Sequence, residues 1–198
     1  MNPALPAPSF AIGVAWLAWA ASWIAAAAWT RRTVARAGYW RAFPSRLVLL
    51  IGGLLLFVSL ATEASLFPQL WSTSGAVGWV LFAGVLAGMG FAWWARLHLG
   101  ALWSGTVTRK QDHHIVDSGP YGIVRHPIYS GILFSLWMTA LDRGRVEPLA
   151  GAALLSAGLW MQARLEEQFL AQELGPAEYA SYRARVPMLA PLPKGPGA

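Results

Sequence analysis

Two long uncharged runs constrain the fold of this 198-residue chain more than any other feature. Residues 10–29 and 75–95 are stretches of 20 and 21 residues without a charged side chain. A helix that crosses the hydrocarbon core of a bilayer needs about 20 apolar residues, because each residue advances it by about 1.5 Å. Apolar residues make up 56% of the chain and charged residues 12%, which is atypical of a soluble domain. The sequence therefore predicts an all-α integral membrane helical bundle.

Three further apolar segments raise the predicted number of transmembrane helices to about five. The run 47–62 stops at Glu63 and then stays apolar for eight more residues, so we expect a tilted span that contains this acid or ends near it. Residues 127–141 and 148–163 are shorter, at 15 and 16 residues, and a six-residue turn joins them. Short helices of this kind predict a C-terminal helical hairpin whose open ends emerge into a polar, protein-lined site.

The charges of the connecting segments predict the orientation. Segment 30–46 carries five arginines and no acid, whereas segment 63–75 carries a single acid. Lys and Arg collect on the cytoplasmic side of a membrane, so five spans place the N-terminus outside and the C-terminus in the cytoplasm. The net charge of +6 follows from this loop bias, and we expect no nucleic-acid partner. Thirteen arginines against two lysines favour a GC-rich bacterial genome and hence a bacterial inner membrane.

We divide the chain into two functional regions. Residues 1–95 are predicted to form an N-terminal transmembrane scaffold of three spans, and residues 96–198 the region that carries the chemistry. In the third span, Gly84 and Gly88 form a GxxxG pair that would let a neighbouring helix approach closely.

Helical spacing continues beyond the fifth span. Apolar residues recur at helical intervals as far as Gly175-Pro176, a pair that stops one helix and starts another. Tyr179, Tyr182 and Val186 then recur at intervals of three and four residues. We therefore expect a short cytoplasmic amphipathic helix.

Polar residues with chemical potential gather at the open end of the hairpin. All four histidines lie between positions 98 and 126. Pro127 opens the fourth span, so His126 is the predicted N-cap and Arg125 lies just outside, at a helix end that favours anions. Glu166 and Glu167 lie just beyond the fifth apolar run, at the same membrane level as His126. The hairpin thus brings an anion-binding end and a cation-binding end into one pocket.

Other ligand classes fit this pocket less well. His113, His114 and His126 could supply metal ligands with a glutamate, but their spacing matches no ordinary ligand pattern and the chain has no cysteine. No Gly-rich phosphate loop is present for a dissolved nucleotide cofactor. We expect no metal, and a zwitterionic ligand with a carboxylate, an ammonium and a sulfonium fits better.

Two motifs carry a resemblance to a known family. GPYGIVRHPIYSG at 119–131 is followed, after one helical hairpin, by RLEEQFLAQELGPAEYASYRARVP at 164–187. With Leu99-Gly100 upstream, this pattern resembles the integral membrane methyltransferases of the isoprenylcysteine carboxyl methyltransferase and phospholipid methyltransferase superfamily. The resemblance covers residues 97–193, about half the chain.

The resemblance implies that S-adenosyl-L-methionine is held at the cytoplasmic face. His126 and the amides that follow it would take the methionine carboxylate, and Glu166 the ammonium or the ribose hydroxyls. Tyr121 and Tyr129 would pack on the adenine or the sulfonium, although interfacial anchoring is an alternative role for both. The matching cofactor-binding positions are His113, Ile115, Val116, Tyr121, His126, Pro127, Tyr129 and Glu166.

The resemblance also implies a methyltransferase that acts on a hydrophobic or lipid-like acceptor, which would enter sideways from the bilayer. Carboxylate O-methylation ranks first, lipid amine N-methylation second and small-thiol S-methylation third. Gln162 stands where isoprenylcysteine enzymes carry an arginine suited to a substrate carboxylate, and Arg164 is the nearest cation on that helix. We assign both to the substrate, Arg125 and Glu167 to catalysis, and Glu167 as the base for an amine or thiol. The outside alternative is a non-catalytic membrane scaffold or transporter.

Overall fold

The structure is a computed structural model of the chain. It describes residues 7–29, 33–36, 39–62, 67–100, 103, 108–110, 115–174 and 176–191. The helices are α1 (Pro8–Ala26), α2 (Phe43–Ala61), α3 (Gly75–Leu99), α4 (Pro120–Ile123), α5 (Pro127–Arg143), α6 (Val146–Leu174) and α7 (Pro176–Arg185). A 3-10 turn, η1 (Tyr39–Ala42), precedes α2.

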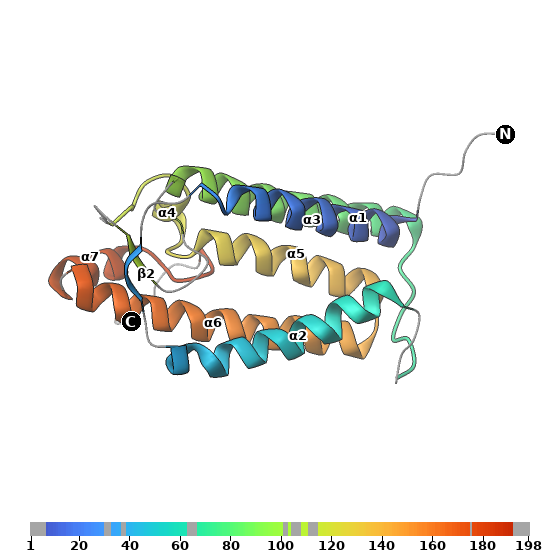
Figure 1. Ribbon diagram of the computed structural model, residues 1–198. Helices are drawn as coiled ribbons and strands as arrows, with labels where there is room; N and C mark the ends of the chain where they lie inside the picture. The colour runs from blue at the N-terminus through green and yellow to red at the C-terminus, as the bar shows by residue number, and fades with distance from the viewer. Residues whose placement is uncertain are drawn as a thin grey trace.

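The long helices run side by side along one bundle axis (Figure 1). Helix α3 packs against α1 and α5, and α2 packs against α6, so that α5 lies between the two outer pairs. The short helices α4 and α7 lie at one end of the bundle, where α5 begins and α6 leaves it. The turn between α5 and α6 lies at the opposite end, together with the start of α1. The predicted helical bundle with a C-terminal hairpin is confirmed.

Among the residues that the structure describes, three helices meet the length and composition that a membrane span requires, and all three correspond to predicted spans. They are Pro8–Ala26, Trp40–Val58 and Gly75–Leu99. Helix α2, which contains most of the second span, ends at Ala61, two residues before Glu63, so the alternative that the span ends near this acid is the one the structure supports. The chain is an integral membrane protein by these helices, while a count of five spans and the orientation stay predictions.

The connecting segments contain a short sheet that the sequence did not predict. Strand β1 (Thr33–Arg36) pairs antiparallel with β2 (Thr108–Lys110), with a register shift between Thr33 and Ala35. Each strand is only three or four residues long. Segments this short lack the period-two pattern that identifies a strand, so pairing across 70 residues of chain is not readable from sequence.

Glycines set the close approach of the long helices. A Cβ at Gly88 would collide with Ser135 and the carbonyl of Gly131, and one at Gly84 would lie 2.9 Å from the Met138 side chain. The predicted role of the GxxxG pair in packing is therefore confirmed, with α5 as the neighbour. Where apolar side chains gain little by leaving lipid, such close packing is a principal source of helix association.

A second glycine contact joins α2 to α6. A Cβ at Gly52 would lie 2.9 Å from the Gly151 carbonyl oxygen, and the reciprocal Cβ would lie 2.8 Å from the Gly52 carbonyl oxygen. The two helices thus approach backbone to backbone at the middle of α2 and near the start of α6. This contact holds α6 in the bundle, and with it the acids at its exit.

The turn of the hairpin ends α5 with a glycine. Gly144 is the C-cap in the left-handed conformation, with φ 57° and ψ 36°, which side chains other than glycine rarely adopt. The segment before α3 closes over this turn, because the Trp71 indole donates to the Leu141 carbonyl at 3.0 Å. Ser9 at the start of α1 donates to the buried Asp142 at 2.7 Å. These bonds fix the end of the bundle remote from the histidines.

Candidate cofactor site

The start of α5 has the local structure that the sequence predicts. His126 is the N-cap and Pro127 the first helical residue, where a missing amide proton costs nothing. The Arg125 and His126 amides donate to the carbonyls of Pro187 and Met188 at 2.8 and 3.1 Å. The chain after α7 therefore runs along the entrance of α5 and fixes its conformation.

Arg125 and Glu167 form a buried ion pair at this entrance. The Arg125 Nε lies 2.8 Å from the Glu167 Oε1, and the two side chains are only 5% and 4% exposed. Arg125 Nη1 also donates to the carbonyls of Val186 and Arg183. Both partners need these bonds, because an unpaired charge in such a place would cost several kcal/mol.

His126 lies between the two adjacent glutamates. Its Nε2 is 3.2 Å from the Glu167 Oε1, and its Nδ1 is 3.5 Å from the Glu166 Oε2. Its ring stacks on Tyr129 with the planes 5° apart and the centroids at 5.5 Å, and the Tyr129 hydroxyl donates to Glu166 Oε1. The predicted meeting of His126 with the two acids is thus present in the structure.

These contacts set the protonation of the cluster. Burial lowers the pKa of His126, but hydrogen bonds and the negative charges of Glu166 and Glu167 outweigh it, so the pKa is raised. Burial raises the pKa of Glu167, but His126 and Arg125 more than offset it, so this pKa is lowered. Both shifts favour the charged forms. The site therefore presents cationic and anionic groups together in a buried place.

Tyr121 is held above the cluster by two neighbouring elements. It is 8% exposed, and its carbonyl accepts from the Tyr182 hydroxyl of α7 at 2.8 Å. Burial raises the pKa of Tyr121, and the nearby charge of Glu166 contributes to the rise. Tyr179, Tyr182 and Val186 form a small core on which Ile115 packs. The amphipathic character of α7 is confirmed, and its apolar face packs on Ile115 and on Leu170 and Ala171 of α6.

The remaining predicted residues lie at different places. Gln162 accepts from Ser45 of α2 at 3.0 Å, and Arg164 lies exposed over the Trp160 ring, 5.4 Å from its centroid. The structure therefore does not bring either into the polar cluster. Val116 is half-buried in the segment before α4. His113 lies outside the described residues.

One buried oxygen in the cluster lacks a partner. Glu167 Oε2 is buried and has no hydrogen bond to any part of the chain that the structure describes. Both bonds from Arg125 and His126 go to the other oxygen, Oε1. A buried carboxylate oxygen normally accepts at least one hydrogen bond. This oxygen therefore has free capacity to accept a hydrogen bond.

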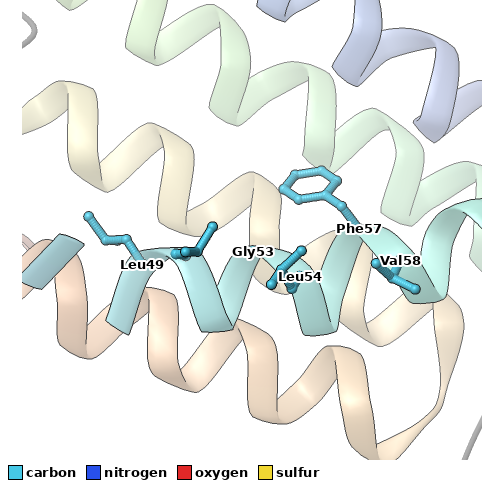
Figure 2. Close-up of a pocket in the computed structure, with 6 residues that line it drawn as sticks. Leu49, Gly53, Leu54, Phe57 and Val58 are labelled. Atoms are coloured by element: carbon cyan, nitrogen blue, oxygen red, sulfur yellow. The ribbon is translucent and has the colours of Figure 1, made fainter. Parts of the chain in front are cut away.

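An apolar groove lies along α2, away from the polar cluster. Its lining is formed by Leu49, Leu50, Gly53, Leu54, Phe57 and Val58, and Figure 2 shows five of them labelled along one helix. Phe57 also meets Trp16 of α1 edge to face, with the ring centroids 5.2 Å apart. The groove therefore lies within a predicted membrane span, and its walls are hydrocarbon.

Sequence reasoning missed two components of the site. The first is the set of backbone carbonyls after α7, which carry no side-chain signal and become visible only when the chain has folded back. The second is His98 at the end of α3, which contacts Ser118, Gly119 and Tyr121. Its position at the cytoplasmic end of the third predicted span, level with His126, was the available signal.

Comparison with known proteins agrees with these motifs. Residues 79–172 match the Isoprenylcysteine carboxyl methyltransferase (ICMT) family. The resemblance predicted from the sequence is confirmed. The matched stretch contains α5, the exit of α6 and every residue of the polar cluster, but not α7.

Two relatives illustrate the range of this similarity. Methanethiol S-methyltransferase 2 of Bradyrhizobium diazoefficiens is 27% identical over 170 residues, which cover 72% of this chain and 58% of the relative. Protein-S-isoprenylcysteine O-methyltransferase B of Arabidopsis thaliana is 32% identical over 90 residues, which cover 43% of this chain and 44% of the relative. The chain thus spans about half the length of each of these relatives.

Proposed function

We propose that the chain is a membrane-embedded methyltransferase that uses S-adenosyl-L-methionine and acts on a hydrophobic acceptor. The observation that carries the proposal is the unsatisfied Glu167 Oε2 in a buried cluster of opposite charges. The family match to residues 79–172 and the printed names of both relatives support the reaction class.

The residues present fit the cofactor by charge and by hydrogen bonding. S-adenosyl-L-methionine carries two positive groups and one carboxylate, and the cluster holds both anionic and cationic side chains with which these groups can pair. Glu167 Oε2 would accept from the ammonium or from a ribose hydroxyl. The first-turn amides of α5 lack backbone acceptors in any helix, so they remain donors for the carboxylate. The His126 amide is already bonded to Met188, which leaves this role to Ile128 and Tyr129.

The cofactor supplies an electrophilic methyl group on sulfur, and the protein's task is alignment and exclusion of water. A buried site that holds the nucleophile about 3 to 3.5 Å from the methyl carbon in line with the sulfur provides most of the acceleration. Tyr121 and α7 close the site on the cytoplasmic side. A carboxylate acceptor has no proton to lose, so Glu167 would act as a base only for an amine or a thiol. Its pairing with Arg125 and His126 lowers its pKa and makes it a weak base.

Carboxylate O-methylation is the acceptor reaction that the sequence ranks first. Thiol S-methylation, which the sequence ranks third, is the alternative that we favour over the lipid amine. Thiol methylation is favoured because polar side chains that could bind a substrate carboxylate are already hydrogen-bonded. Arg125 Nε and Nη1 are already bonded to Glu167 and to backbone carbonyls, and the Gln162 amide oxygen is bonded to Ser45. A thiol, which becomes neutral sulfide on methylation, needs no additional cation.

Calorimetry of the detergent-solubilised protein with S-adenosyl-L-methionine tests the proposal. We expect saturable heat for the wild type and its loss in H126A, because His126 contacts both glutamates. G90A serves as the matched control, since a Cβ at Gly90 meets nothing within 4 Å. Absence of heat in the wild type would refute cofactor binding and favour a scaffold or transporter.

A methyl-labelling assay separates the acceptor classes. Labelled cofactor is incubated with the protein and total membrane lipid or a small thiol, and the product is then treated with base. Methyl esters release volatile methanol under base, whereas N-methyl products and thioethers do not. Release of labelled methanol would support carboxylate methylation, and a base-stable product formed with the thiol would support thiol methylation.

A further inference from the structure

His98 links the end of α3 to the turn that carries Tyr121. Its Nε2 lies 3.0 Å from the Ser118 hydroxyl, and its ring stacks on Tyr121 with the planes 24° apart and the centroids at 6.3 Å. His98 thus contacts both the residue two positions before α4 and the second residue of α4. No role was assigned to His98 by the motifs of the sequence.

The same ring occupies the space beside Gly119. A Cβ on Gly119 would lie 2.8 Å from the His98 Cε1 and 3.0 Å from each ring nitrogen. Gly119 has φ 56° and ψ −131°, a conformation that is open to glycine and strained for other residues. The backbone at Gly119 therefore lies directly against the imidazole of His98. The ring in this position restricts where the backbone at Gly119 can lie.

The position of His98 is itself fixed by the bundle. It belongs to the last turn of α3, and α3 is locked onto α5 by the close contact at Gly88. The start of α5 carries His126 and Tyr129, which face the glutamates. A rigid path thus runs from α5 through α3 and His98 to the Tyr121 turn.

We infer that His98 is a positioning residue for the cofactor, acting through Ser118 and Tyr121 rather than by direct contact. This inference rests on the proposed function, because it assumes that Tyr121 borders the cofactor. With the hydrogen bond in place, the turn holds Tyr121 against the polar cluster. Without it, α4 keeps its bond to Tyr182 on one side only, and the cofactor must order the turn as it binds.

The test measures the affinity for S-adenosylhomocysteine, the product form of the cofactor, by calorimetry on the full chain. A neutral hydrogen bond is worth about 1 kcal/mol, so H98F, which keeps a stacking ring, should raise the Kd about fivefold. S118A should have the same effect. The double variant H98F/S118A should be no weaker than either single variant, because both remove the same bond.

Two controls separate positioning from general loss of structure. H98Q keeps an amide near the position of Nε2 and should restore the Kd to within about twofold of wild type. L97A changes the neighbouring exposed side chain and should leave the Kd unchanged. A purely structural role would lower the unfolding temperature of H98F and S118A and leave the Kd of the folded variants unchanged.

The outcomes are distinct from those of the proposed function. Absence of heat in the wild type contradicts cofactor binding itself. Wild-type binding together with an unchanged Kd in H98F and S118A overturns only the inference about His98. Effects that multiply in the double variant also overturn it, because the two side chains would then act independently. If H98F does not fold, S118A alone decides, since it leaves the ring in place.

Discussion

Removing one member of the Arg125–Glu167 pair should destabilise the protein at least as much as removing both. The two side chains are almost fully buried and joined by a bond of 2.8 Å. E167L leaves the guanidinium with backbone carbonyls only, and R125M leaves the carboxylate with His126 only. The double variant R125M/E167L removes both charges and fills the space with apolar atoms.

The expected magnitude follows from the partners that remain. Breaking a buried ion pair by removing one partner costs about 3 to 5 kcal/mol, and we take about 3 kcal/mol because each partner keeps other bonds. For a chain of this length, that corresponds to a fall of about 6 to 12 °C in unfolding temperature. The double variant should fall by no more than either single variant, which gives a coupling free energy of about 3 kcal/mol.

Thermal unfolding in detergent, followed by the fluorescence of the twelve tryptophans, measures these shifts. L97A provides the control for a substitution at an exposed position near the same end of the bundle. If the decreases in unfolding temperature add in the double variant, to about 12 to 24 °C, the reasoning is refuted. They would mean that the two side chains stabilise the fold separately and that the pair is not formed in the folded protein.

Three further predictions concern other parts of the structure. The pKa of His126 is raised, so the stability it contributes is complete below pH about 6.5 and is lost as the pH rises through the folded-state pKa. The unfolding temperature should therefore fall between neutral and alkaline pH, and H126Q should flatten this fall; a variant that keeps the full dependence would contradict the assignment. G88A should cost about 1 to 3 kcal/mol by forcing α3 from α5, whereas G90A should not, and equal unfolding temperatures would exclude the close contact. Y182F removes the hydroxyl that donates to the Tyr121 carbonyl, and should cost about 1 kcal/mol and weaken cofactor binding in calorimetry; unchanged values would show that this bond does not hold α4.

Local features were readable from the sequence because they depend on neighbours along the chain. Pro127 and His126 define the start of α5, and α6 ends at Leu174 before α7 begins at Pro176, as predicted. The position of Glu166 and Glu167 beside His126 followed from the hairpin, since two antiparallel helices joined by a short turn bring their far ends together. Hydrophobic length and capping chemistry thus predicted both the fold class and the centre of the site.

Features that depend on distant backbone were not readable. The partners of Arg125 include the carbonyls of Arg183 and Val186, and every residue offers a carbonyl, so the sequence cannot mark these two. Gln162 was expected to face the substrate, yet it meets Ser45 because α2 packs on α6 through Gly52. Which helices become neighbours is decided by tertiary packing, and helical periodicity alone does not specify it.

A crystal structure of the protein with S-adenosylhomocysteine tests the central claim most directly. The claim is that the start of α5 and the exit of α6 together bind the methyl donor at the polar cluster of Arg125, His126, Glu166 and Glu167. The account predicts a polar atom of the ligand within about 3.2 Å of Glu167 Oε2, with the adenosine bordered by Tyr121. A ligand bound elsewhere in the bundle, with Glu167 Oε2 still lacking a partner, would contradict it.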